Sequence, residues 1–316
     1  MAAPEEGNQT SITEFILLGF GTLPKLQILR FLLFLVIYIT TMAGNILIMV
    51  LVVTDEHLHT PIYFFLGNLS CLETCYASTI LLRMLASLLT GDRTISVSGC
   101  ITQYYFFSSL LATECLLLSV MSYDRYVAIC QLLHYERVMN MGACVQMAAR
   151  AWASGVLYAA LHTGNTFAVS FCRGNKVDQF FCDIPQLLKL TCSDSNLTEK
   201  GVILFSVGLA LCCFVFITVS YVQIISTVLG IPSEQGRHKA FSTCLPHLTV
   251  LSLLVFTGCF AYLKPLSSST SWLDLVVAVF YSVLPPVMNP IICSMRNKEI
   301  KASLWKLTGW RLSTKD

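Results

Sequence analysis

The sequence has few charged residues: only 12% of its 316 residues are Asp, Glu, Lys or Arg, whereas 55% are hydrophobic. A soluble domain is about 25% charged, so this chain has too few polar side chains to cover a water-facing surface. The high hydrophobic content equally excludes a disordered chain. Twenty basic residues against 18 acidic ones give a net charge of only +2, so the basic excess typical of nucleic-acid binding is also missing. The composition therefore indicates a membrane protein.

Long apolar runs fill most of the chain. A helix needs ~20 mostly apolar residues to cross ~30 Å of hydrocarbon. Seven runs fit this requirement, and they lie at about 26–53, 62–85, 100–126, 144–168, 199–227, 240–263 and 272–295. We therefore predict an all-α fold, a seven-transmembrane helix bundle over residues 26–295, between an amino terminus of residues 1–25 and a tail of residues 296–316.

The orientation of the bundle follows from the amino terminus. This segment lacks the basic region and the early apolar core of a signal peptide, so the first span is expected to act as its own insertion signal. Asn8 begins a glycosylation sequon, and Asn196 begins a second one in the long polar connection of residues 169–198. Lys and Arg are slightly more numerous on the opposite side of the membrane. We expect an extracellular amino terminus, with glycosylation at Asn8 and Asn196 as a second candidate.

The tail contains a short amphipathic pattern. Ile300, Leu304 and Leu307 recur at helical spacing, and lysines occupy the rest of the turn. This pattern predicts a helix that lies on the inner leaflet of the bilayer. A frayed, solvated tail is the alternative.

Four cysteines lie on the expected outer side: Cys100, Cys172, Cys182 and Cys192. In an oxidising compartment they indicate two disulfides, for which three pairings exist. Zinc binding is less favoured, because neither a CxxC motif nor a nearby pair of histidines accompanies them.

Two carboxylates fall inside the predicted spans, where an ionisable group is costly and suggests function. Glu73 and Glu114 each lie 11 residues from the inner end of their span, or about 16 Å deep at 1.5 Å per residue. At a common depth they would either share a proton or hold a small cation, and we favour the cation site. A purely structural pair, or a pair that never meets, is the alternative.

Other functional classes lack their sequence features. The chain has no HExxH motif, Walker A loop or Ser-His-Asp set, so neither an enzyme nor a cofactor is expected. A channel or transporter would need a continuous polar lining, which the spans do not offer beyond the two carboxylates. The odd number of spans and the lack of an internal repeat also fit poorly with a transporter made of paired halves.

A series of motifs resembles the vertebrate olfactory receptors, a branch of the rhodopsin-like G-protein-coupled receptors, from about residue 10 to residue 307. The most specific is MSYDRYVAIC at 121–130. The others, in order, are GN at 44–45, PIYFFL at 61–66, LS at 69–70 before Glu73, SY at 220–221, KAFSTC at 239–244 with HL at 247–248, and PVMNPII at 286–292. Four positions depart from the family pattern: Cys293 replaces a Tyr, Leu132 replaces a Pro, and Leu254-Val255 replaces Phe-Tyr.

This resemblance implies an odorant receptor that raises cAMP through a stimulatory olfactory-type G protein. It implies disulfides between Cys100 and Cys182 and between Cys172 and Cys192. It also implies that a sodium ion binds at the depth of Glu73 and Glu114. It implies roles in activation and G-protein coupling for Asp124, Arg125, Tyr126, Tyr221, Arg237, His238, Lys239, Asn289 and Pro290. The implied partners are a small volatile odorant, the G protein, the lipid bilayer, trafficking accessory proteins and arrestin, at the plasma membrane of olfactory cilia. A related receptor with a ligand or tissue outside olfaction is the alternative.

The ligand site is expected in the outer half of the bundle. On the third span, helical spacing places Tyr104, Phe107, Ser108, Leu111 and Ala112 on one face, together with Cys115. The resemblance adds Phe205, Ser206, Leu209, Val255, Cys259, Tyr262, Val279 and Ser282 from later spans. This set is mostly apolar with a few hydroxyls, which suits a small neutral ligand.

Overall fold

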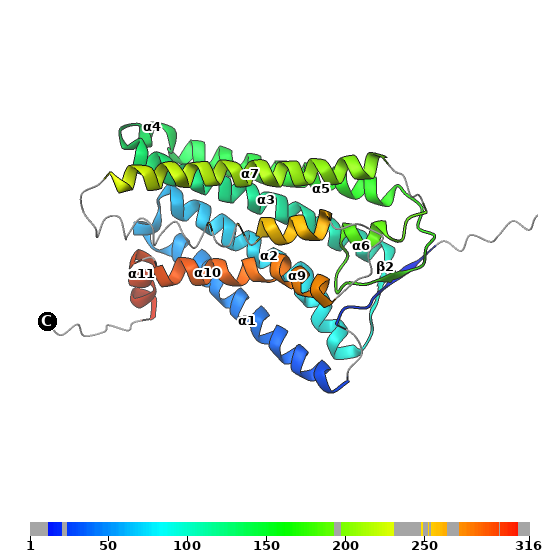
Figure 1. Cartoon of the computed structure of the whole chain (residues 1–316). Coiled ribbons are helices and arrows are strands. Elements are labelled where there is room, and N and C mark those ends of the chain that lie inside the picture. Colours follow the sequence, from blue (N-terminus) through cyan, green and yellow to red (C-terminus); the bar gives the residue numbers. More distant parts are fainter. Residues whose placement is uncertain are drawn as a thin grey trace, which may run out of the picture.

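The computed structural model describes residues 12–20, 24–192, 197–230, 248, 252, 254–263, 272–296 and 298–308, and within this part the chain is mostly helical. The long helices run beside one another, with α1 inclined to the rest (Figure 1). They are α1 (Pro24–Thr54), α2 (Pro61–Thr90), α3 (Val97–Cys130), α5 (Met141–Phe167), α7 (Leu197–Leu229), α9 (Trp272–Ser282) and α10 (Leu284–Arg296). The shorter helices are η1 (Glu56–Leu58), η2 (Leu132–His134), α4 (Tyr135–Val138), α6 (Ile184–Leu188) and α11 (Lys298–Thr308).

Five of the helical segments are long and apolar enough to cross a membrane: Leu26–Thr54, Pro61–Thr90, Val97–Cys130, Ile203–Leu229 and Trp272–Ile291. Their outward faces carry large apolar side chains, such as Leu29, which is 62% exposed, and Leu204, which is 64% exposed. Such faces are stable against lipid rather than water. Of the two other expected spans, α5 is 27 residues long but less apolar, and the sixth is described as a helix only over Leu254–Leu263.

Local sequence signals set several helix ends. Asn140 caps α5, because its Oδ1 accepts the backbone N–H of Ala143 at 2.9 Å. Helix α2 ends at Gly91, whose φ of 77° is readily available only to glycine. The last expected span is interrupted at Val283, between α9 and α10. Pro285 and Pro286 follow at once, and proline has no backbone N–H to continue the helical hydrogen bonds.

The mostly helical structure agrees with the predicted helical class, and it adds a small sheet, which was not predicted, at the end of the bundle that carries α6 (Figure 1). Its strand order is β2-β1-β3, formed by Thr94–Ser96, Glu14–Leu17 and Lys176–Val177. Strand β1 is antiparallel to β2 and parallel to β3. Phe15 of β1 is fully buried, and its ring meets that of Phe171 edge-on at 5.4 Å. The amino-terminal strand thus joins two connections that are far apart in the sequence.

Two glycines allow helices to approach closely. A Cβ on Gly155 of α5 would lie 2.7 Å from the backbone oxygen of Ser109 in α3, and also within contact of Thr113. A Cβ on Gly44 of α1 would lie 3.0 Å from the Cβ of Pro290 in α10. Small residues at such crossings let the helix backbones pack together in a membrane.

We predict that Gly155→Ala destabilises the bundle, because the added methyl group must displace backbone atoms of α3. The expected cost is about 1–3 kcal/mol, measured as a lower thermal unfolding midpoint of the solubilised protein. Gly164→Ala is the matched control on the same helix, since a Cβ there would meet nothing within 4 Å. Equal stability of the two variants would contradict the proposed close packing of α3 and α5.

Candidate functional site

A cavity with an empty volume of about 890 Å³ lies among α3, α5, α6, α7, the segment Leu254–Leu263 and α9. Its wall is mainly apolar, with hydroxyl and thiol groups set into it. Of the predicted ligand-binding residues, the structure places on this wall Tyr104, Ser108, Leu111, Ala112, Ser206, Leu209, Val255, Cys259 and Tyr262. The face predicted on the third span from helical spacing therefore lines a cavity, Cys115 included, except at Phe107.

Four of the predicted ligand-binding residues do not line the cavity. Phe107 is fully buried and packs against the rings of Tyr76 and Phe181 instead. Phe205 lies on the outward face of α7, where it is 57% exposed. Val279 packs against the hydrophobic core, and the Ser282 hydroxyl donates to the backbone oxygen of Ala278 at 2.6 Å. For these residues, small differences in helix rotation decide whether the side chain points into the core, toward lipid or into the cavity.

Sequence reasoning missed several lining residues, chiefly Tyr158 of α5, Ile184 of α6, Cys213 of α7 and Tyr281 of α9. Tyr158 had a usable signal: it lies four residues before His162, so the two polar rings share one face of α5. Ile184 had none, because the short helix that positions it lies within the long polar connection.

Asp183 holds the short helix α6 over the outer side of the cavity. Its carboxylate accepts the hydroxyls of Tyr262 at 2.8 Å and Tyr281 at 2.5 Å, and the backbone N–H of Ile184 at 2.9 Å. Burial raises the pKa of this carboxyl above its ordinary 3.8, while the three donors oppose the rise. One buried acceptor thereby ties the loop to the segment Leu254–Leu263 and to α9.

Two disulfides fix the same connection. Cys100 of α3 is bonded to Cys182, next to Asp183, with a Cα–Cα distance of 5.6 Å. Cys172 is bonded to Cys192 with a Cα–Cα distance of 5.1 Å. The backbone N–H of Cys182 also donates to the side chain of Gln103 at 3.0 Å. The covalent and polar links together hold the loop in one place across the mouth of the bundle.

A polar cluster occupies the centre of the bundle. Glu73 and Glu114 are both fully buried and lie close together. Asn289 donates to one oxygen of Glu73, and Asn45 donates to the backbone oxygen of Pro286 at 3.2 Å. Within the part of the chain that the structure describes, both oxygens of Glu114, Oε2 of Glu73 and Oδ1 of Asn45 have no hydrogen-bond partner. The cluster therefore has oxygen acceptors without a donor. Among the described residues, no group of three or more His, Cys, Asp or Glu side chains is arranged so that it could hold a metal ion.

At the end of the bundle opposite to α6, Asp124 is 2% exposed and accepts a hydrogen bond from the hydroxyl of Tyr135 at 2.9 Å. Arg125 and Tyr126 follow on α3, and Tyr221 is buried on α7. Leu133, in the turn after α3, is 98% exposed, and sequence reasoning did not select it. The predicted residues Arg237, His238 and Lys239 lie outside the described residues, as do Asn8, Asn196 and the side chain of Cys293.

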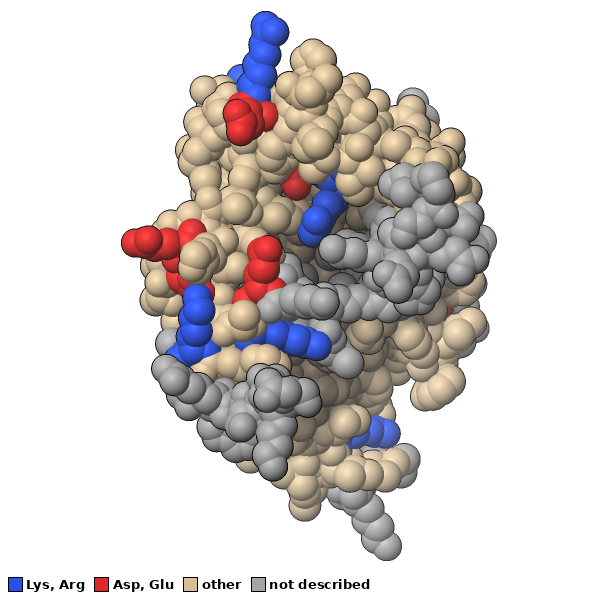
Figure 2. All heavy atoms as spheres, turned by 90° about the vertical axis from the view of Figure 1, so that its left-hand side faces the viewer, with Lys and Arg blue, Asp and Glu red and all other residues tan. Residues whose placement is uncertain are grey.

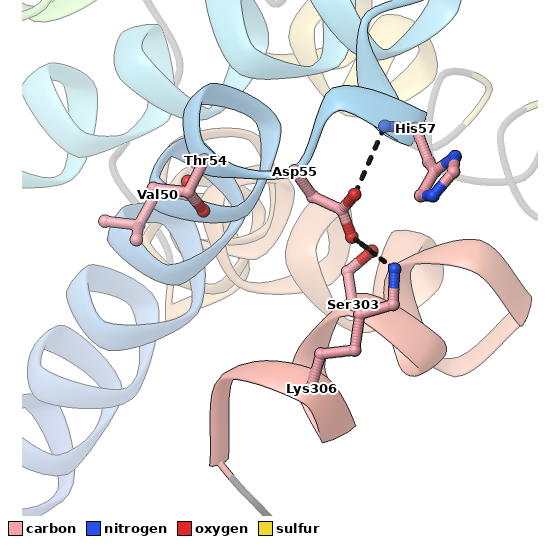
Figure 3. A network of polar contacts seen from close by, with 6 residues as sticks. All are labelled: Val50, Thr54, Asp55, His57, Ser303 and Lys306. Carbon is pink, nitrogen blue, oxygen red and sulfur yellow. Dashed lines mark hydrogen bonds and ion pairs between the residues drawn. The ribbon is translucent and has the colours of Figure 1, made fainter.

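Charged side chains of both signs gather on this end (Figure 2). Helix α11 turns across it and docks on the connection between α1 and α2 (Figure 1). Ser303 and Lys306 of α11 point toward Asp55, at 2.5 Å and 3.4 Å from its Oδ2 (Figure 3). The Tyr63 hydroxyl donates to Glu299 of α11 at 2.5 Å. The Ser303 hydroxyl is the largest cause that lowers the pKa of Asp55 below its ordinary 3.8, followed by the backbone N–H of His57 and by Lys306.

Known proteins resemble this chain over nearly its whole length. The family model described as "Olfactory receptor" matches residues 34–309. Olfactory receptor 14A16 of Homo sapiens is 49% identical over 308 residues, which are 98% of this chain and 99% of that protein. Olfactory receptor 14L1 of Homo sapiens is 46% identical, with 96% of this chain and 93% of that protein covered. Olfactory receptor 5AP2 of Mus musculus is 44% identical, with 95% of each chain covered.

We predict that Asp55→Asn loosens α11, since it removes the charge that Lys306 and Ser303 face but keeps an oxygen acceptor. Amide hydrogen exchange over residues 298–308 should become about two- to fivefold faster. Lowering the pH should also speed the exchange. The pKa of Asp55 is lower when α11 is docked, so the ionised carboxylate stabilises the docked helix above pH 3.8, and this stabilisation is lost as the pH falls through the lowered pKa. Glu56→Gln, which removes the neighbouring exposed carboxylate, is the control and should leave the exchange unchanged.

Proposed function

The chain belongs to the olfactory receptor family, and on this premise we propose that it binds small, mostly apolar volatile molecules in the cavity and activates a stimulatory olfactory-type G protein, which raises cAMP. As a member of this family it is a receptor rather than an enzyme. The observation that carries the proposal is the cavity itself, which has a mainly apolar wall and is covered by α6. Such a wall releases water when an apolar ligand enters, while its few hydroxyls orient the ligand.

The proposed receptor has seven transmembrane spans over residues 26–295, at the ranges predicted from the sequence, with residues 1–25 outside the cell and 296–316 in the cytoplasm. The five apolar helices support this arrangement, and so does the length of α5, at 27 residues. The disulfide-bonded loop would then lie in the oxidising extracellular space, where disulfides persist. Asn8 is the proposed glycosylation site, with Asn196 as a second candidate.

In the proposed mechanism, ligand binding shifts the receptor toward a state in which the inner ends of the helices separate. A ligand acts only through its difference in affinity for the two states. Asp124 and Tyr135 would hold the resting state, and Arg125 would meet the G protein once that contact opens. Tyr221, Tyr126, Asn289 and Pro290 would take part in the rearrangement, as would Arg237, His238 and Lys239. The fully exposed Leu133 adds an apolar contact for the G protein on the same end.

The central cluster is the proposed sodium site. Its buried, unpaired oxygens are carboxylate and amide oxygens, the ligands that hard cations prefer. Glu73 and Glu114 would hold the ion, whose single positive charge would offset one negative charge at a place where a charged carboxylate is costly to bury. No other cofactor is proposed.

We place the receptor in the plasma membrane, with olfactory cilia as its proposed location. The proposed partners beyond the odorant, the G protein and the bilayer are trafficking accessory proteins and arrestin. Helix α11 would lie along the inner leaflet, where Trp305, 47% exposed, can contact lipid.

Coupling is tested by measuring cAMP in cells that co-express the receptor and the olfactory-type G protein, over a broad odorant panel. We expect a response from the wild-type receptor that falls to background in Arg125→Ala at equal surface expression, because the cation that meets the G protein is gone. Arg137→Ala, an exposed arginine on the same end, is the control and should respond normally. Silence of a well-expressed wild-type receptor towards every odorant would contradict the proposed function.

Sodium binding is tested by thermal unfolding of the solubilised receptor in sodium chloride and in choline chloride of equal ionic strength. We expect sodium to stabilise the wild type, by about 1.4 kcal/mol at a concentration ten times its Kd. Glu73→Gln should remove this effect, since its amide keeps an acceptor for Asn289 but lacks the charge. Glu136→Gln, an exposed carboxylate, should retain the effect, and an equal sodium response in all three proteins would exclude the site.

A further inference from the structure

Two side chains of α11 converge on one atom of the connection between α1 and α2, the Oδ2 of Asp55 (Figure 3). The Ser303 hydroxyl lies 2.5 Å from this atom, and Nζ of Lys306 lies 3.4 Å from it. A carboxylate only accepts hydrogen bonds, so Ser303 is the donor. On the same helix, Ile300 is 2% exposed and packs into the hydrophobic core. The Ser303 hydroxyl therefore faces a negative charge where the tail docks on the bundle.

The sequence around Ser303 has the charge pattern of a kinase substrate. Lys301 lies two residues before it and Lys306 lies three residues after it. Kinases select their substrates partly by the charges beside the reacting hydroxyl, and basic residues on both sides suit an acidic substrate groove. Thr54 and Thr60, on either side of the same connection, have no lysine or arginine within three positions. The pattern thus distinguishes Ser303 from the hydroxyls closest to it in the connection.

A kinase can reach Ser303 only when α11 leaves its docked position, because the residue is 4% exposed there. Helix α11 has 11 residues, fewer than an isolated helix needs to be stable in water. The Lys306 side chain is 62% exposed, and exposed ion pairs contribute little stability. Local opening of α11 is therefore expected to expose the hydroxyl at intervals.

A phosphate on Ser303 would oppose the return of α11 to its docked position. Phosphorylation replaces the O–H that donates to Asp55 with an ester oxygen that carries no proton. It also adds a charge of about −1.5 to −2 beside the carboxylate. Lys306 has a single positive charge and cannot neutralise both groups. Repulsion between the phosphate and Asp55 therefore disfavours the docked state.

We propose that Ser303 is a phosphorylation site for a Ser/Thr kinase with an acidic substrate groove, and that its phosphate releases α11 from Asp55. The hydroxyl oxygen attacks the γ-phosphorus of a nucleoside triphosphate, and the bond from that phosphorus to the bridging oxygen breaks. The hydroxyl proton passes to the kinase, and the nucleoside diphosphate leaves. The inference rests on the proposed orientation, in which residues 296–316 are cytoplasmic, and it requires neither the odorant nor the G protein.

The first test incubates the purified full chain with the catalytic domain of protein kinase C, magnesium and ATP, and locates the phosphate by mass spectrometry. We expect the phosphate on Ser303. Asp55→Asn should raise the initial rate about two- to fivefold, because α11 opens more often. Lys301→Ala should lower the rate, since it removes a charge that the kinase recognises. Glu56→Gln is the control and should leave the rate unchanged.

The second test measures amide hydrogen exchange over residues 298–308 in variants of equal size. We expect Ser303→Glu to exchange about two- to fivefold faster than Ser303→Gln, since the two differ only in the charge beside Asp55. In the Asp55→Asn background this difference should vanish, because the repelling charge is gone. Ala302→Glu adds the same charge at the exposed neighbouring position and should exchange like the wild type. Unchanged exchange over residues 61–90 verifies that the bundle is intact in each variant.

The inference is overturned if the kinase leaves Ser303 unmodified, if it modifies Thr308 alone, or if Lys301→Ala is modified at the wild-type rate. Equal exchange in Ser303→Glu and Ser303→Gln would also overturn it. So would a difference that persists in the Asp55→Asn background, because another contact would then cause it. A receptor that gives these expected results but is silent toward every odorant contradicts the proposed coupling and leaves the inference standing. One that responds to odorants but is not modified at Ser303 has the reverse meaning.

Discussion

The hydrogen bond from Asn289 to Glu73 joins α2 to α10 in the middle of a bundle whose outer surface is apolar. Lipid offers no partner to a polar group, so these side chains must find one another inside the protein. Asn45 adds α1 to the same cluster through the backbone oxygen of Pro286, and Gly44 lets α1 come close enough to α10 to do so. The cluster constrains the rotation of α1, α2, α3 and α10, and with it the side chains that α3 presents to the cavity.

Hydropathy predicts where the helices lie, because crossing hydrocarbon imposes one length and one composition on each span. It does not determine rotation: on α3, Phe107 has the same spacing as Ser108 and Leu111 yet is buried among other rings. Tyr158 was not predicted as a site residue because nothing in a single span tells which helix it will face. The sheet was not predicted because strands of two to four residues carry too short a pattern, and their pairing depends on segments about 80 and 160 residues away.

Tyr281 links the two polar regions of the molecule. Its hydroxyl donates to Asp183 in the loop above the cavity, and its backbone oxygen accepts the hydroxyl of Tyr76 at 3.2 Å on α2, the helix that carries Glu73. Two residues further on, the helix is interrupted at Val283. Tyr281 therefore contacts the loop that carries Asp183, lines the cavity and bonds to α2. It lies two residues before the break between α9 and α10.

The position of β1 at the centre of its sheet has a consequence for biosynthesis. This strand leaves the ribosome first, but β3 is made only about 160 residues later, which takes on the order of ten seconds or more at cellular elongation rates. During that interval the edge of β1 that pairs with β3 has no partner, and an unpaired strand edge can pair with other extended segments. Completion of the sheet therefore requires that the connection between α2 and α3, which carries β2, and the long connection between α5 and α7, which carries β3, are both in place.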